Sequence, residues 1–74
     1  MRKFLVPIVI EKDKDGYFAL CPVLPGCYSQ GDTYEEALEN IEDAVRLHIA
    51  DRLANGEPIP TTDSVSLSTL EVRM

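Results

Sequence analysis

Few side chains of this sequence have the types and spacing that chemistry requires. Cys21 and Cys27 are separated by Pro-Val-Leu-Pro-Gly, which is not the C-x-x-C spacing of a zinc site, and no histidine follows them at metal-ligand spacing. His48 is the single histidine, and no acid and nucleophile are arranged with it. We therefore expect two reduced, semi-buried thiols and a histidine packed at the margin of a helix, with no enzymatic activity and no cofactor.

The segment Glu11-Lys12-Asp13-Lys14-Asp15-Gly16 is similar to the start of a calcium-binding loop. Such a loop begins with Asp and carries a bidentate Glu at its twelfth position, where this chain has Glu11 and Pro22. Strand-type sequence flanks the segment, whereas helices flank a calcium loop. A plain charged turn is the better interpretation, and no metal site is expected.

The elements that would position these side chains follow from the apolar pattern. Residues 3–11 are rich in Val, Ile, Leu and Phe and predict a strand buried on both faces, although Pro7 cannot donate a hydrogen bond to a neighbouring strand. After the polar turn at 11–16, residues 17–21 resume apolar sequence and complete a hairpin. Residues 27–30 are extended in character and predict a third strand.

The stretch from Cys21 to Leu38 concentrates the residues with special backbone properties. Pro25 restricts φ, and Gly26 and Gly31 permit positive φ, which predicts turns on both sides of the third strand. Because this stretch joins the hairpin to the only long helix, we expect it to set how the two pack together.

The helix is predicted to begin at Asp32 and Thr33 and to run to Asn55, with a glycine and then a proline beyond it as the stop. Thr33 and Glu36 have the spacing of a capping box, and Asp32 with Glu35 is an alternative pair.

One stripe of this helix is expected to face the sheet, because its residues recur at spacings of three and four. The stripe contains Tyr34, Leu38, Ile41, Val45, His48 or Ile49, and Arg52. Glu39 and Asp43 fall on the solvent side. Leu47, Ala50 and Ala54 form a small second apolar set, for which partner contact and incidental exposure are equally open.

The C-terminal residues complete the predicted architecture. Residues 65–72 have strand composition, with a slip in alternation that a bulge would explain. The order is therefore β-β-β-α-β, an α+β fold in which one helix packs on one face of a single sheet. With 74 residues, the chain from 1 to 74 is expected to form a single domain.

A family resemblance lies in the central run of the chain. Residues 16–38 read G-Y-F-A-L-C-P-V-L-P-G-C-Y-S-Q-G-D-T-Y-E-E-A-L, which resembles the signature of the HicB-like antitoxin family, and the similarity extends over residues 3–60. The resemblance implies a fold like that of a truncated ribonuclease H. It also implies a partner, a small HicA-like toxin that cleaves mRNA.

Two departures from the family pattern qualify this function. Active ribonuclease H enzymes gather several carboxylates around a metal, whereas the centre of the first predicted strand is Val-Pro-Ile-Val. About 18 residues follow Gly56, too few for the helix-turn-helix or ribbon-helix-helix that DNA-binding family members carry. We expect the toxin-binding domain without a C-terminal DNA-binding domain.

The charge balance bears on the class of partner. Lys and Arg number 7 against 13 Asp and Glu, which gives a net charge of −6 and a pI near 4.5. This charge disfavours direct binding of nucleic acid and favours a basic protein, although acidity for solubility alone explains it equally well. The apolar N-terminal run is interrupted by Pro7 and is too short to span a membrane, so a cytoplasmic location is expected.

The leading hypothesis is an antitoxin-type binding module that uses Tyr17, Tyr28 and Gln30 for partner contact. The alternative is a self-associating orphan domain that binds another protein or a small ligand. A homodimer or higher homo-oligomer is expected in either case, because one helix covers only one face of the sheet while Leu5 and Val9 make the other face apolar.

Overall fold

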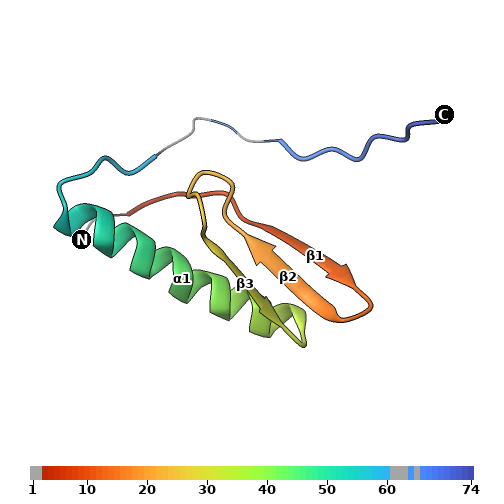
Figure 1. Ribbon diagram of the computed structural model, residues 1–74, viewed down its shortest axis with the longest axis horizontal. Helices are drawn as coiled ribbons and strands as arrows, with labels where there is room; N and C mark the ends of the chain where they lie inside the picture. Colours follow the sequence, from red (N-terminus) through yellow and green to blue (C-terminus); the bar gives the residue numbers. More distant parts are fainter. Residues whose placement is uncertain (1–2, 61–63, 65) are drawn as a thin grey trace.

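The computed structural model describes residues 3–60, 64 and 66–74. It contains an antiparallel sheet in the order β1-β2-β3 and one long helix that lies across a single face of the sheet (Figure 1). The elements are β1 (Val9–Asp13), β2 (Gly16–Leu20), β3 (Tyr28–Gly31) and α1 (Tyr34–Ala54). The predicted α+β class is confirmed, whereas the likeness to ribonuclease H stays a prediction.

The first hairpin is tighter than the sequence indicated. β1 pairs with β2 from Val9 opposite Leu20 to Asp13 opposite Gly16, so the charged segment 11–13 belongs to the strand. The turn is left with two residues, and the N–H of Asp15 donates to Oδ1 of Asp13 at 2.8 Å. This Asx-type bond closes the turn locally.

The predicted first strand is wrong in its N-terminal half. Residues 3–8 are not part of the sheet, because β2 leaves the sheet after Leu20 and no described strand lies opposite them. Pro7 also has no backbone N–H, so it could not donate a hydrogen bond to a neighbouring strand. The expectation that both faces are buried is also wrong, since Val6 packs against the core while Leu5 is 87% exposed.

The predicted strand at 65–72 is not observed. Residue 65 lies outside the described residues, and residues 66–74 are extended without strand pairing (Figure 1). A strand is defined by hydrogen bonds to a neighbour, and no described segment of this chain lies beside these residues to supply them.

The core lies between the sheet, α1 and the loop that joins β2 to β3. It contains Ala19, Cys21, Leu24, Cys27, Ala37, Ile41 and Val45. The loop is held by backbone bonds in which Cys21 donates to Cys27, Leu24 to Cys21, and Cys27 to Leu24, at 3.0–3.1 Å. Both thiols are free and buried, and burial, together with the neighbouring Cys21, raises the pKa of Cys27.

Local hydrogen bonds determine both ends of α1. Thr33 is the N-cap, and its side chain accepts a bond of 3.1 Å from the N–H of Glu36. At the other end, Gly56 donates to the carbonyl of Leu53 at 3.2 Å and Glu57 to that of Arg52 at 2.8 Å. This pair of bonds is a Schellman motif.

The two glycines that flank β3 act in different ways. Gly26 has φ of +78°, as predicted for a turn that needs a left-handed residue. Gly31 does not use the positive φ that glycine permits, although β3 ends there. A Cβ at Gly31 would lie 2.6 Å from the backbone nitrogen of Ala37, and its role is to let β3 pass close to α1.

The stripe of α1 that faces the sheet differs from the predicted one. Ile41 and Val45 are buried as expected, but Ala37 is the third buried residue, and Tyr34 and Leu38 are 48% and 38% exposed. The close approach of β3 leaves room for alanine and moves the larger side chains to the margins of the stripe. Among the described residues, no helix is long and apolar enough to span a membrane.

Candidate protein-binding site

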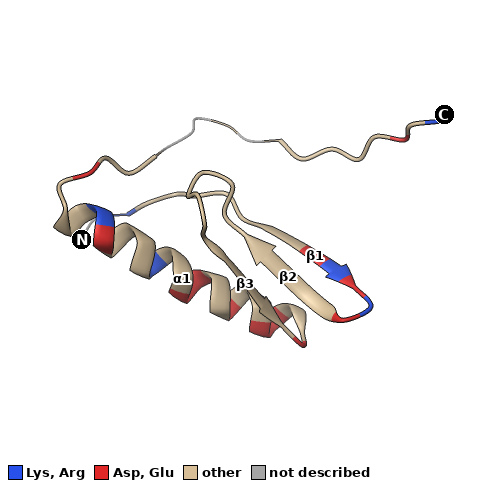
Figure 2. Cartoon of the chain, viewed as in Figure 1, with Lys and Arg blue, Asp and Glu red and all other residues tan. Residues whose placement is uncertain are grey.

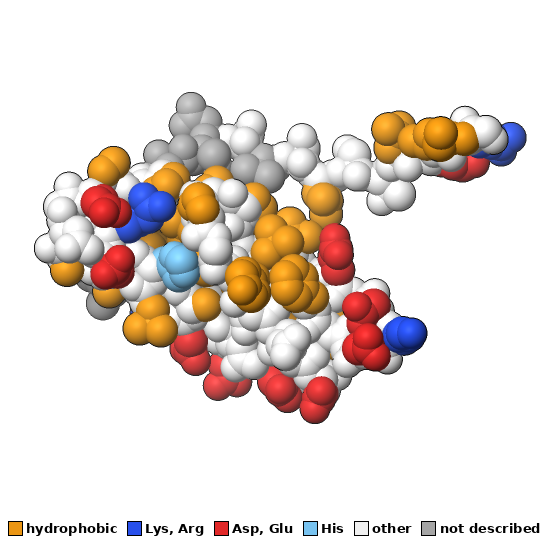
Figure 3. All heavy atoms as spheres, viewed as in Figure 1, with side chains coloured by type: hydrophobic (Ala, Val, Ile, Leu, Met, Phe, Trp, Pro, Cys, Tyr) orange, Lys and Arg blue, Asp and Glu red, His pale blue; other side chains and the backbone are white. Residues whose placement is uncertain are grey.

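The sheet face that α1 leaves open is apolar and aromatic. Side chains of directly paired residues share a face, and the pairs Val9–Leu20, Leu20–Tyr28 and Phe18–Gln30 lie opposite the core. We call this surface the outer face; it contains Val9, Glu11, Phe18, Leu20, Tyr28 and Gln30. Figure 3 shows hydrophobic side chains gathered over the strands, with acidic side chains towards one edge.

Two aromatic rings dominate the outer face. Phe18 and Tyr28 lie diagonally across the β2–β3 pair and stack with ring centroids 6.0 Å apart and an interplanar angle of 28°. Tyr28 is 63% exposed and Phe18 is 39% exposed. Stacking limits their motion, so this surface offers contact area at a small entropic cost.

The predicted contact residues do not all lie together. Tyr28 and Gln30 share the outer face, whereas Tyr17 points to the side of the sheet that α1 covers. The ring of Tyr17 meets the ring of Tyr34 edge-on, with centroids 6.4 Å apart and an interplanar angle of 83°. Phe18 is the outer-face aromatic that sequence reasoning missed, and its alternation with the core residue Ala19 was the signal that could have found it.

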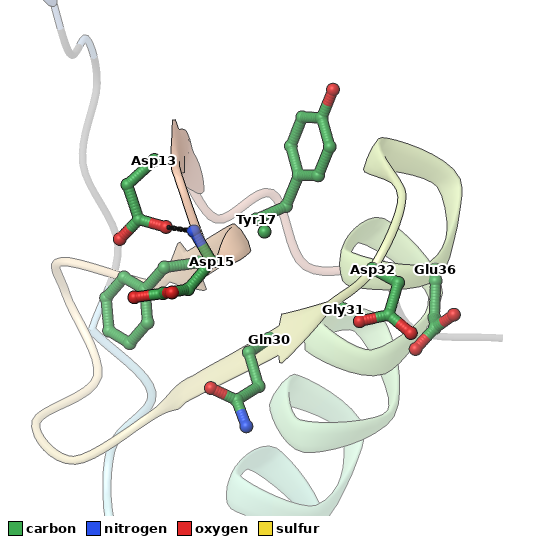
Figure 4. Close-up of a pocket in the computed structure, with 9 residues that line it drawn as sticks. Asp13, Asp15, Tyr17, Gln30, Gly31, Asp32 and Glu36 are labelled. Carbon is green, nitrogen blue, oxygen red and sulfur yellow. Dashed lines mark hydrogen bonds between the residues drawn. The ribbon is translucent and has the colours of Figure 1, made fainter.

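An acidic cleft of about 610 Å³ adjoins the outer face, between the β1–β2 turn and the start of α1. Four carboxylates line it (Figure 4), and no Lys or Arg does; they are Asp13, Asp15, Asp32 and Glu36. Phe18 and Gln30 line the cleft as well; Tyr17 borders it, but its ring points away from the carboxylates (Figure 4). The outer face and the cleft are therefore one continuous surface.

The cleft is assembled by strand pairing from segments distant in the sequence. Asp32 and Glu36 were assigned from the sequence only to the start of the helix, and the other two carboxylates only to a turn. The β2–β3 register, with Tyr17 opposite Gly31, brings these segments to the same end of the sheet. Across the described residues, no three His, Cys, Asp or Glu side chains are grouped to hold a metal ion.

Negative charge continues along the first half of α1 (Figure 2). Glu35 and Glu36 lie in the first turn, where the helix dipole favours anions. Arg46 pairs with Glu42 at 3.0 Å, but both side chains are largely exposed, so this pair contributes little to stability. An aromatic surface bordered by carboxylates suits contact with a basic protein.

The chain is similar to proteins of a known family. The family described as the HicB-like antitoxin of bacterial toxin-antitoxin system matches residues 6–72. The chain belongs to the HicB-like antitoxin family. This confirms the assignment made from the central sequence run, and it places the outer face and acidic cleft on a HicB-like antitoxin domain.

Relatives and a solved structure share most of this HicB-like domain. A UPF0150 protein of Synechocystis is 48% identical over 59 residues, which are 78% of this chain and 75% of the relative. A UPF0150 protein of Helicobacter pylori is 57% identical over 47 residues, or 64% and 65% of the two chains. A chain in a solved HicA3 and HicB3 toxin-antitoxin complex aligns with a TM-score of 0.61 and 32% identity, covering 78% of this chain and 70% of that one.

Proposed function

We propose that this HicB-like domain neutralises a HicA-like, mRNA-cleaving toxin by protein–protein contact and without catalysis. The observation that carries the proposal is the continuity of the stacked Phe18–Tyr28 pair with a cleft that four carboxylates line. The solved structure to which this domain is similar is a HicA3 and HicB3 complex, which supports a partner of this kind.

Electrostatics supplies the mechanism of neutralisation. A protein that cleaves mRNA presents a positive surface to the phosphate backbone. Lys and Arg side chains of such a surface are complementary to the acidic cleft, so a bound antitoxin occupies the place of the RNA. The toxin is then inhibited because the bound antitoxin covers its RNA-binding surface.

The outer face supplies most of the affinity in this proposal. Large aromatic side chains at the centre of an interface typically dominate binding energy, and charged rims contribute mainly to association rate and specificity. Tyr28 is the most exposed aromatic side chain of this surface, and Gln30 beside it offers an amide for hydrogen bonding. Tyr17 borders the cleft, but its ring packs against Tyr34 on the other side of the sheet, so we do not include it in the contact surface.

The test is co-expression with any HicA-like toxin found encoded beside this chain, together with a binding titration of the purified pair. Tyr28→Ala is expected to raise the dissociation constant by roughly 30-fold, as for an interface hot spot, and to weaken growth rescue. Glu39→Ala, a change at an exposed residue of α1, is the matched control and is expected to change the dissociation constant by about 2-fold or less. Equal effects of the two variants would contradict the assignment of the outer face.

A second measurement addresses the cleft. Asp15→Asn with Asp32→Asn removes two charges without changing side-chain size, and the association rate is expected to fall while dissociation changes little. Glu57→Gln, an exposed acid beyond the end of α1, is the control for net charge. If the wild-type domain neither binds nor rescues against any neighbouring toxin, the proposal fails and the self-associating orphan domain is the better interpretation.

A further inference from the structure

Cys21 and Cys27 are buried nucleophilic side chains that the proposed function does not use. Each is 3% exposed, both belong to the same core cluster, and both thiols are free. They stand at the two ends of the loop that joins β2 to β3. Two thiols that lie side by side can form a disulfide, so their relative position decides what oxidation does to this loop.

The register of the sheet places the two cysteines opposite each other. The β2–β3 register ends with Leu20 opposite Tyr28, so one further step along both strands sets Cys21 against Cys27. A backbone bond supports this step, because the N–H of Cys21 donates to the carbonyl of Cys27 at 3.0 Å. Residues two apart along a strand share a face, so both side chains continue the core face that contains Ala19.

This position meets the geometric requirement of a disulfide. Opposite residues of an antiparallel pair have Cα atoms roughly 4.5–5.5 Å apart, and a disulfide needs a Cα separation of roughly 4.4–6.8 Å with both Cβ atoms on one side. An electrostatic effect agrees with this proximity, since burial and the charge of the neighbouring Cys21 raise the pKa of Cys27. The two sulfur atoms can therefore be joined without a rearrangement of the strands.

We propose that Cys21 and Cys27 form an oxidation site, at which a small hydroperoxide such as hydrogen peroxide converts the two thiols into a disulfide within one chain. One sulfur, as its thiolate, attacks a peroxide oxygen; the O–O bond breaks, and the hydroxide that leaves takes up a proton and forms water. The product is a sulfenic acid. The other sulfur attacks the sulfenic sulfur, the S–S bond forms, the S–O bond breaks, and the oxygen leaves as a second water with the remaining thiol proton. The thiols lose two electrons in total, and these reduce the peroxide to water.

Burial makes this a reaction of the opened loop. The closed loop is held by the N–H of Leu24, which donates to Cys21, and by the N–H of Cys27, which donates to Leu24, both at 3.1 Å. The side chain of Leu24 is 1% exposed and helps to cover the thiols. Local opening of the loop uncovers both thiols together. The raised pKa of Cys27 keeps its thiolate scarce, so the reaction is slow while the loop is closed.

The disulfide holds the two ends of the loop together once it has formed. It closes the segment 21–27 covalently and removes conformations from the unfolded chain, which stabilises the folded state. The cysteine pair is adjacent to the Leu20–Tyr28 pair, so the end of the sheet that carries Tyr28 is fixed as well. The stability of this domain therefore depends on whether peroxide or a reductant is present.

The first test is treatment of the reduced, full-length chain with hydrogen peroxide. The intact mass is expected to fall by two hydrogen atoms, both thiols are expected to be lost when they are titrated in denaturant, and dithiothreitol is expected to restore them. The product is expected to run as a single chain on a non-reducing gel. Retained thiols, a gain of oxygen atoms in the final product, or disulfide-linked pairs of chains would overturn the proposal.

Cys21→Ala with Pro22→Cys is the matched control for the register. This variant keeps two thiols in the loop, but residue 22 is exposed and lies one position away from the residue opposite Cys27. Peroxide is expected to give it oxygen-containing or interchain products in place of the internal disulfide. If this variant closed an internal disulfide as fast as the wild type, closeness in sequence would explain the reaction and the assignment from strand register would be wrong.

The second test measures what the disulfide does to the fold. The oxidised chain is expected to unfold at a temperature roughly 10 °C higher than the reduced chain. Cys27→Ala, treated with the same peroxide, is expected to show no rise. An oxidised wild type that unfolds at or below the temperature of the reduced chain would contradict the stabilising role. Mass, thiol content and unfolding are all measured without a toxin, so failure here is distinguishable from failure of the proposed function.

Discussion

At the scale of single residues, Gly31 controls how closely β3 can approach α1. A Cβ there would lie 2.6 Å from the nitrogen of Ala37 and 3.0 Å from Cβ of Glu36. Because part of this contact is helix backbone, it cannot yield without moving the strand or the helix. The close approach in turn keeps Ala37 buried and the start of α1 beside the cleft.

Gly31→Ala is therefore expected to lower the free energy of unfolding by about 2–3 kcal/mol through overpacking. Gly26→Ala is the matched control, because its Cβ would meet nothing and only the positive φ of +78° would cost about 1 kcal/mol. Urea midpoints of the two variants measure the difference. A loss at Gly26 as large as that at Gly31 would contradict the packing argument.

The helix cap is a second single-residue contribution. Thr33→Ala removes the acceptor for the N–H of Glu36 and is expected to lower the free energy of unfolding by about 1 kcal/mol. Thr33→Ser keeps the hydroxyl, and its free energy of unfolding is expected to stay within a few tenths of a kcal/mol of the wild-type value. Thermal or urea unfolding followed by circular dichroism measures both, and an Ala variant as stable as the Ser variant would show that another group caps the helix.

At the scale of elements, the loop from Cys21 to Cys27 acts as part of the core. Leu24 is 1% exposed and is one of the two largest fully buried side chains among the described residues. A connection that contributes a buried leucine replaces the packing that a longer sheet would supply.

Leu24→Ala is expected to cost about 2–5 kcal/mol, which is enough to unfold a domain of this size. Leu24→Met conserves volume and is expected to cost less than about 1.5 kcal/mol, so it stays folded and measurable. The urea midpoints of these two variants are compared with that of Val23→Ala, a smaller truncation at a half-buried neighbouring residue. If Leu24→Ala and Val23→Ala lowered the free energy of unfolding by equally small amounts, the loop would only connect the strands and would not be part of the core.

The same loop gives the protein a pH-dependent stability. Burial and the neighbouring Cys21 raise the pKa of Cys27, so its neutral thiol is favoured in the folded state. This contribution is complete below the pKa of the unfolded thiol and is lost as the pH rises through the raised, folded value. Unfolding measured from pH 7 to 10 is expected to show stability falling at the alkaline end, and Cys27→Ala is expected to reduce this slope.

At the scale of the whole molecule, the uneven distribution of charge directs association. The net charge is −6, and the carboxylates of the hairpin turn and of the first half of α1 lie on the same side as the acidic cleft (Figure 2). A field of this kind accelerates encounter with a positive surface and is screened beyond about 8–10 Å at physiological salt.

Binding to a HicA-like toxin is therefore expected to weaken with added salt mainly through slower association. Raising the salt from 50 to 500 mM is expected to lower the association rate by roughly 10-fold or more, with a much smaller change in dissociation. Stopped-flow mixing or surface plasmon resonance measures both rates. An association rate independent of salt would contradict the electrostatic argument.

The sequence alone determined the elements whose signals are local. A threonine three residues before a glutamate marks the start of α1, a glycine marks its end, and the motif of residues 16–38 identifies the HicB-like family, because capping, turn geometry and a motif depend on adjacent residues.

Only the tertiary structure decided what depends on a partner strand or a close contact. Residues 3–8 are apolar enough for a strand but are not part of the sheet, and residues 66–74 have strand composition but pair with no described strand. Likewise, Gly31 matters through its distance from Ala37 rather than through its own φ, and the four carboxylates of the cleft meet only because β2 pairs with β3. Strand pairing and packing join residues distant in the sequence, and a local pattern does not contain the identity of the neighbour.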